Sequence, residues 1–294
     1  MNQLFDARRW WLLVRKHWSE NKKKYTLSLV AIAGLLLLWF ILKISSEPGS
    51  IGIELQINTY YSGLFIVGCL YASMLFADLG SRTRGLNYMV VPASQLEKLL
   101  CSLFYGVVVF VVCYTAIFYM VDMIAVKAGN AIAYNRWLKG HSAGDIFVPG
   151  KVYNVFSSPD HHANHPGFVF YLLLCYFALQ AAFIYGSLFF PKFSFIKTVI
   201  ALLLIGVCIS FFIAKVIAHI LPPGNYQHDL TSYEVFTVKP TASGDGVMIY
   251  NDPASDKLIT LPEWIGDVLV FLLKYAFAPL FWLATYYRLK EKEI

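Results

Sequence analysis

The sequence predicts an all-α membrane protein with six transmembrane helices and with both chain ends in the cytoplasm. Of its 294 residues, 58% are hydrophobic and 14% are charged, whereas about a quarter of the residues in soluble domains are charged. The apolar residues gather in runs close to the roughly 20 residues that an α-helix needs to cross a bilayer. Lys and Arg are concentrated in particular connecting segments, as expected when those segments face the cytoplasm.

The first predicted span covers residues 26–44 and carries a single charge, Lys43, near its end. It is not a typical cleavable signal peptide, because a long basic segment precedes it and no small-residue cleavage pattern follows it. The other predicted spans cover residues 58–76, 99–125, 167–190, 197–221 and 265–287. Residues 26–294 are therefore predicted to form one six-helix transmembrane domain.

Residues 1–25 predict a separate amphipathic helix that lies in the cytoplasmic membrane interface. Apolar residues recur at the three- and four-residue spacing of one helix face, and most basic residues fall on other faces. Tryptophan also favours the headgroup level of a bilayer. A simple basic anchor is the alternative interpretation. The apolar positions are Leu4, Ala7, Trp11, Val14 and Trp18, and the basic positions are Arg8, Arg9, Arg15 and Lys16.

The orientation follows from the basic residues. They crowd the N-terminal segment, the connection between the second and third spans, the short turn at Lys192 and Lys197, and the C-terminal tail. Two predicted outer loops, residues 127–166 and 222–264, are about 40 residues long and hold few basic residues. Residues 236–238 and 247–250 in the second loop favour a small hairpin. We attribute the net charge of +6 to topology and to contact with anionic membrane lipids, not to nucleic-acid binding.

The five cysteines all lie inside apolar runs. This placement argues against a disulfide framework and against a cysteine-ligated metal site. We interpret them as small buried hydrophobic residues. They are Cys69, Cys101, Cys113, Cys175 and Cys208.

The connection between the second and third spans contains a helix-start pattern. Pro92 interrupts the chain, and Ser94 precedes Glu97 by three residues. In such a capping box the Ser hydroxyl accepts from the Glu amide, and the Glu carboxylate accepts in return from the Ser amide. Glu97 also complements the positive end of the helix dipole. Ser94 and Glu97 can therefore be explained by helix structure alone, and the resemblance described next offers a functional explanation as the alternative.

The same segment, Val91-Pro92-Ala93-Ser94-x-x-Glu97-Lys98, resembles the Pro-Ala-Ser-x-x-Glu-Lys signature of a group of ABC-2-type permease-like proteins. Val91 stands where Leu is expected. The plan of an N-terminal interface helix, six spans and two cytoplasmic ends is also similar to that superfamily. In ABC-2 permeases this loop forms a coupling helix that docks on an ATP-binding subunit. The resemblance implies that this contact involves Arg82, Arg84, Tyr88, Pro92, Ser94, Glu97 and Lys98.

The chain has no nucleotide-binding machinery of its own. No G-x-x-x-x-G-K-[ST] sequence is present, so we expect neither an enzyme nor a cofactor in this chain. The resemblance implies a permease subunit in the inner (cytoplasmic) membrane that moves a lipidic or hydrophobic substrate. It also implies a separate ATP-binding cassette ATPase subunit and a homodimer or a heterodimer with a similar permease. A membrane scaffold that organises an envelope complex through its outer loops is the alternative.

Polar residues within predicted spans suggest a polar path. Asp122 lies near the outer end of the third span, and Lys215 and His219 share a face near the outer end of the fifth. Lys274 lies deeper, in the sixth span. Asp122 is a candidate partner for Lys215 or Lys274. For Lys215 the alternative is a side chain that extends to the lipid headgroups.

A weak metal-site candidate is His161, His162 and His165, with Asp160 and His141 nearby in the sequence. Imidazoles bind Zn²⁺, but this spacing lacks the Glu of an H-E-x-x-H helix. A membrane-embedded metal hydrolase would also need a general base, and none is near. A polar loop that leads into the fourth span is the favoured interpretation.

Overall fold

The computed structural model describes residues 5–46, 50–80, 85, 90–140, 147–156, 168–190, 192–212, 215, 225–227, 236–239, 257–259, 271 and 275–291. The chain forms two compact units. The first comprises Met1–Phe195 and Ala278–Ile294, and the second comprises Ile196–Phe277.

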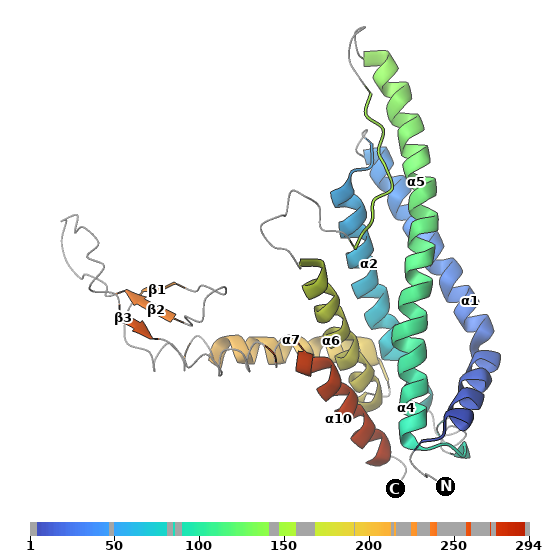
Figure 1. The fold of residues 1–294 in the computed structure, drawn as a ribbon, viewed down its shortest axis with the longest axis vertical. Helices are drawn as coiled ribbons and strands as arrows, with labels where there is room; N and C mark the ends of the chain where they lie inside the picture. Colours follow the sequence, from blue (N-terminus) through green and yellow to red (C-terminus); the bar gives the residue numbers. More distant parts are fainter. Residues whose placement is uncertain are drawn as a thin grey trace. The chain divides into compact units, whose positions relative to one another are not determined.

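Helix α1 (Ala7–Ser46) joins the predicted interface helix and the first predicted span in one continuous helix (Figure 1). At 1.5 Å per residue, its 40 residues extend for about 60 Å. The helix changes direction in its N-terminal part (Figure 1). In that region the hydroxyls of Thr26 and Ser28 donate to backbone carbonyls four residues earlier, and such bonds often bend helices. The boundary expected near residue 25 is thus a bend within one helix.

Helix α2 (Ile53–Met74) packs between α5 and α6 through glycines that admit large aromatic rings. A β-carbon at Gly68 would lie 2.6 Å from the hydroxyl oxygen of Tyr176 in α6 (Phe168–Phe189). At Gly63 a β-carbon would collide with the hydroxyl of Tyr114 in α5. Small residues of this kind let neighbouring helices approach closely, as they do in membrane bundles.

The third predicted span is confirmed as helix but is longer than expected. It consists of α4 (Gln95–Leu103), the π-helical turn η2 (Phe104–Val109) and α5 (Phe110–Gly140). The widened turn directs the carbonyl of Gly106 to the amide of Gln180 in α6, at 2.5 Å. Because α5 continues to Gly140, the first predicted outer loop begins with helix instead of loop.

Part of that outer loop, residues 147–156, lies in extended form against the helices; we name it the strap (Figure 1). The amide of Asn130 donates to the Gly150 carbonyl and accepts from the Gly150 amide, both at 2.8 Å. Gln56 donates to the Lys151 carbonyl at 2.8 Å and accepts from the Tyr153 amide at 3.0 Å. Two side-chain amides therefore satisfy the strap backbone as a neighbouring strand would.

Helix α10 (Phe277–Glu291) completes the first unit by packing on α6. The rings of Phe281 and Tyr185 lie 6.1 Å apart, and the Arg288 guanidinium lies 5.1 Å from the centre of the Phe189 ring. The beginning of α1 and the end of α10 lie at the same end of this unit (Figure 1).

The second unit contains most of α7 (Ser194–Phe212) and a small antiparallel sheet in the order β1-β2-β3. The strands are β1 (Asn225–Gln227), β2 (Phe236–Lys239) and β3 (Lys257–Ile259). Strand β2 falls at the predicted hairpin and pairs with β1 and β3. Its predicted partner, residues 247–250, lies outside the described residues.

Within the described residues, four helices are long and apolar enough to cross a membrane: Ala7–Ser46, Gln95–Lys139, Val169–Phe189 and Ser194–Phe212. They coincide with the first, third, fourth and fifth predicted spans and support a multi-pass membrane protein. Helix α2 coincides with the second predicted span, but its first half is rich in polar residues. The sixth predicted span is described chiefly through α10.

Candidate functional site

The predicted capping box is present at the start of α4. The Glu97 amide donates to the Ser94 hydroxyl at 3.2 Å, and the Ser94 amide donates to the Glu97 carboxylate at 2.9 Å. The segment that carries the Pro-Ala-Ser-x-x-Glu-Lys resemblance is therefore a helix N-terminus with a fixed geometry.

Glu97 also holds the beginning of α1. Its Oε1 accepts from the backbone amide of Asp6 at 2.8 Å and from the Arg9 guanidinium at 3.1 Å. The Glu97 side chain is fully buried, whereas the Arg9 side chain is 40% exposed. We name the residues that meet here the cap: Asp6, Arg9, Ser94 and Glu97. Because the carboxylate accepts from two backbone amides and a guanidinium, its buried charge is well compensated.

Of the seven residues predicted to contact a partner, the described ones divide by exposure. Glu97 and Lys98 are buried, Ser94 is half-buried and Pro92 is exposed. The buried Glu97 side chain thus holds the start of α4 through hydrogen bonds, whereas Pro92 is exposed and available for contact. The remaining three, Arg82, Arg84 and Tyr88, lie outside the described residues.

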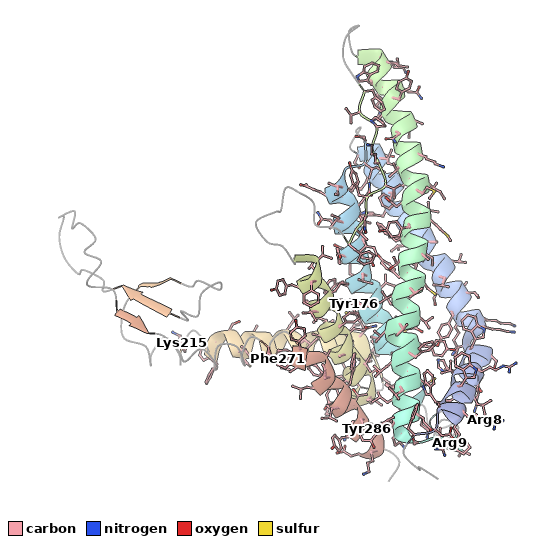
Figure 2. All side chains as sticks on the ribbon, in the orientation of Figure 1. Arg8, Arg9, Tyr176, Lys215, Phe271 and Tyr286 are labelled. Atoms are coloured by element: carbon pink, nitrogen blue, oxygen red, sulfur yellow. The ribbon has the colours of Figure 1, made fainter. Side chains whose placement is uncertain are left out.

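Other residues reach the surface at the same end of the first unit. Val90 is 79% exposed, and Arg8 lies next to Arg9 at the start of α1 with its side chain exposed (Figure 2). Val90, Pro92 and Arg8 are therefore exposed near the cap and belong to the surface at this end of the unit. Sequence reasoning missed the part that α1 has in this surface, although Arg8 and Arg9 were visible as basic residues.

The predicted polar path is described only in part. Asp122 in α5 is fully buried, and neither of its carboxylate oxygens has a hydrogen-bond partner among the described residues. Lys215 is exposed and belongs to the second unit (Figure 2). His219 and Lys274 lie outside the described residues, so the pairing of Asp122 with a lysine stays a prediction.

The candidate metal ligands His161, His162 and His165 also lie outside the described residues, together with Asp160 and His141. In the described part of the chain, no group of three or more His, Cys, Asp or Glu side chains is arranged to hold a metal ion.

Comparison with known proteins identifies no relative. No protein-family model matches the chain, no curated protein matches its sequence and no solved structure matches its fold. Function must therefore be argued from the site itself.

Proposed function

We propose that this chain is the transmembrane permease subunit of an ABC-2-type transporter in the cytoplasmic membrane. It moves a lipidic or otherwise hydrophobic substrate, and a separate ATP-binding subunit supplies the energy. A second permease copy, identical or similar, completes the path. The observation that carries the proposal is the cap, in which a buried carboxylate joins the resembling segment to the start of α1.

A rigid cap is what mechanical coupling needs. Motion of a partner bound at Val90 and Pro92 would pass to α4, because Ser94 and Glu97 fix the start of that helix. It would pass to α1 as well, because Glu97 binds Asp6 and Arg9. A partner at this one end would thus act on α1 and on the continuous helix formed by α4, η2 and α5, each of which is long enough to cross the membrane.

The charge distribution is consistent with a cytoplasmic position of the cap. The beginning of α1 and the end of α10 lie at the cap end of the first unit (Figure 1), and both are basic, with Arg8, Arg9, Arg288 and Lys290. Basic residues favour the cytoplasmic side.

The decisive experiment is purification of the full chain from its native membranes, through a C-terminal tag, in mild detergent. We expect a stoichiometric ATP-binding subunit, identified by mass spectrometry, and ATP hydrolysis in the purified complex. The exposed-site variant Val90→Glu should lose the subunit. Its matched control, Val148→Glu, changes an equally exposed valine in the strap, 74% exposed against 79%, and should keep it.

The scaffold alternative predicts a different result, and the ordered strap is the observation that supports it. Gln56 and Asn130 each donate one hydrogen bond to the strap and accept one from it. These four bonds fix the strap on the helices, which would give an outer partner a defined surface. A complex that contains envelope proteins, lacks an ATP-binding subunit and hydrolyses no ATP would overturn the permease proposal and leave the scaffold. In that case Val148→Glu, and not Val90→Glu, should disrupt the complex.

A further inference from the structure

An aromatic cavity of about 250 Å³ lies between α1, α2 and the helix formed by η2 and α5. Its wall includes Trp18 and Tyr25 from α1, Tyr71 from α2, Tyr105 from η2 and Phe110 from α5. The volume is slightly below the roughly 300–1,000 Å³ of pockets that enclose whole small molecules. It is therefore suited to a section of a flexible apolar chain.

Two of the tyrosine hydroxyls in this wall are hydrogen-bonded within the protein. The Tyr105 hydroxyl donates to the Val14 carbonyl at 2.9 Å, and the Tyr25 hydroxyl is hydrogen-bonded to His17 Nε2 at 2.5 Å. Tyr25 stacks on Tyr105 with ring centres 5.7 Å apart, and Tyr71 stacks on Phe110 at 5.1 Å. With these hydroxyls committed to protein partners, the rings offer mainly carbon surface to a ligand.

The π-helical turn shapes one side of the cavity. Tyr105, near the beginning of η2, and Val109, at its end, both line the cavity. From the other side the buried Gln180 holds the Gly106 carbonyl that the widened turn releases. Turns of this kind are rare and frequently mark functional sites. Here the buried Gln180 side chain satisfies the Gly106 carbonyl, so the fold itself stabilises the turn that forms this part of the cavity wall.

Positive charge lies close to the cavity along α1: Lys22 follows Trp18 by four residues and precedes Tyr25 by three, so it shares the helix face that lines the cavity. Trp18 and Ser28 both line the cavity and are both exposed, Trp18 at 45%, so the cavity is open beside α1. Between Trp18 and Tyr25, one turn of α1 carries the exposed Lys22, Lys23 and Lys24. Clusters of lysines at the end of a membrane helix attract anionic lipid headgroups.

We infer that the cavity binds a hydrocarbon chain of an anionic membrane phospholipid, with the headgroup on the lysines at 22–24. The chain contacts the rings of Tyr71, Tyr105 and Phe110, and the tryptophan at residue 18 lies at the headgroup level, where its ring is favoured. This site does not depend on the proposed transport function, because the lipid can be bound whether or not the chain moves it.

The test measures lipid binding to the full-length protein by native mass spectrometry. Delipidated protein is titrated with phosphatidylglycerol or with phosphatidylcholine of the same acyl chains. We expect phosphatidylglycerol to bind more tightly at one site per chain. A diazirine at the middle of its acyl chain should cross-link to peptides that contain Tyr71 or Tyr105.

Matched variants separate this site from general lipid contact. Val67→Phe fills the cavity and should weaken phosphatidylglycerol binding by about tenfold or more, the loss expected when two methylene groups leave an apolar site. Its control, Ile66→Phe, alters the adjacent lipid-facing side chain, which is 60% exposed, and should bind normally. Thermal unfolding of both variants establishes that each is folded.

A second pair tests the headgroup. Replacing Lys22, Lys23 and Lys24 by Gln should abolish the preference for phosphatidylglycerol, whereas the equally charged change of the exposed Lys127, Arg136 and Lys139 to Gln should keep it. Equal binding of the two lipids to the native protein, or equal affinities of Val67→Phe and Ile66→Phe, would overturn the inference. A cross-link confined to other peptides would also overturn it.

Discussion

Arg9 and Glu97 are 88 positions apart in the sequence, yet the Arg9 guanidinium donates to the Glu97 carboxylate at 3.1 Å. The carboxylate is fully buried and is shared with the amides of Asp6 and Ser94. Through these hydrogen bonds, Glu97 joins the beginning of α1 to the beginning of α4.

The first prediction concerns that carboxylate. Glu97→Ala should lower the free energy of unfolding by about 2 kcal/mol or more, because it removes part of a helix cap and leaves two partly buried amides, those of Asp6 and Ser94, without an acceptor. The measurement is thermal or denaturant unfolding in detergent. Glu54→Ala, an exposed glutamate in the first turn of α2, should cost less than about 0.5 kcal/mol. Equal effects of the two variants would contradict the assigned role of Glu97.

The second prediction separates two neighbouring arginines. Arg9→Gln should weaken the cap, because a buried carboxylate loses its charged partner. Arg8→Gln should not, because the exposed Arg8 side chain makes no ion pair or hydrogen bond with any residue that the structure describes, although it lies at the same end of α1 (Figure 2). Hydrogen exchange of the Ser94–Glu97 amides reports the difference: it should accelerate in Arg9→Gln and stay unchanged in Arg8→Gln. Acceleration in both would show a general charge effect.

The third prediction concerns the strap. Gln56→Leu removes two hydrogen bonds to the strap backbone, at Lys151 and Tyr153, and leaves those groups partly buried. The cost should be about 1–3 kcal/mol for each unsatisfied group. Limited proteolysis within residues 147–156 should become faster. Asn58→Leu, an exposed amide on the same helix, is the control. Unchanged proteolysis in Gln56→Leu would mean that the strap is held by other contacts.

The fourth prediction uses two glycines with opposite surroundings. Gly68→Ala places a β-carbon 2.6 Å from the Tyr176 hydroxyl oxygen and should destabilise the protein by about 1–3 kcal/mol. Gly34→Ala in α1 meets nothing within 4 Å and should stabilise by up to about 1 kcal/mol through helix propensity. Adding Tyr176→Phe should recover part of the loss at Gly68. Absence of any recovery would place the strain elsewhere.

The fifth prediction concerns Asp122. Since neither carboxylate oxygen has a partner among the described residues, Asp122→Asn should leave the free energy of unfolding unchanged or raise it, while reducing transport if the residue lines the path. A loss of about 3 kcal/mol or more would instead reveal a paired cation, such as the predicted partner Lys274. Unfolding and transport are measured on the same reconstituted sample.

Much of the helical architecture was predictable, because hydrophobic runs of span length have few other outcomes. The cap at Ser94 was also predictable, since a capping box is local and depends on residues three apart. Helix ends were less accessible: α5 continues to Gly140 through a polar stretch in which nothing breaks the helix.

The long-range relationships could not be predicted from one sequence. Nothing local to Glu97 marks Arg9 as its partner, and nothing near Gln56 or Asn130 marks the strap. The π-helical turn at 104–109 has no sequence signature of its own; it is stabilised by Gln180, 74 positions from Gly106. Such contacts depend on which helices pack against one another and at what relative position, and side-chain packing throughout the unit determines both.

The bond between the Asp6 amide and Glu97 also has a consequence for biogenesis. A ribosome synthesises the start of α1 about ninety residues before it reaches Glu97, so the first helix enters the membrane with its N-terminus unfinished. The hydrogen bond to Asp6 can form only after α4 has been synthesised. The third hydrophobic segment therefore fixes the position of the first one after both have been made. A nascent chain arrested before residue 97 should accordingly present a protease-sensitive N-terminus that becomes protected once synthesis continues.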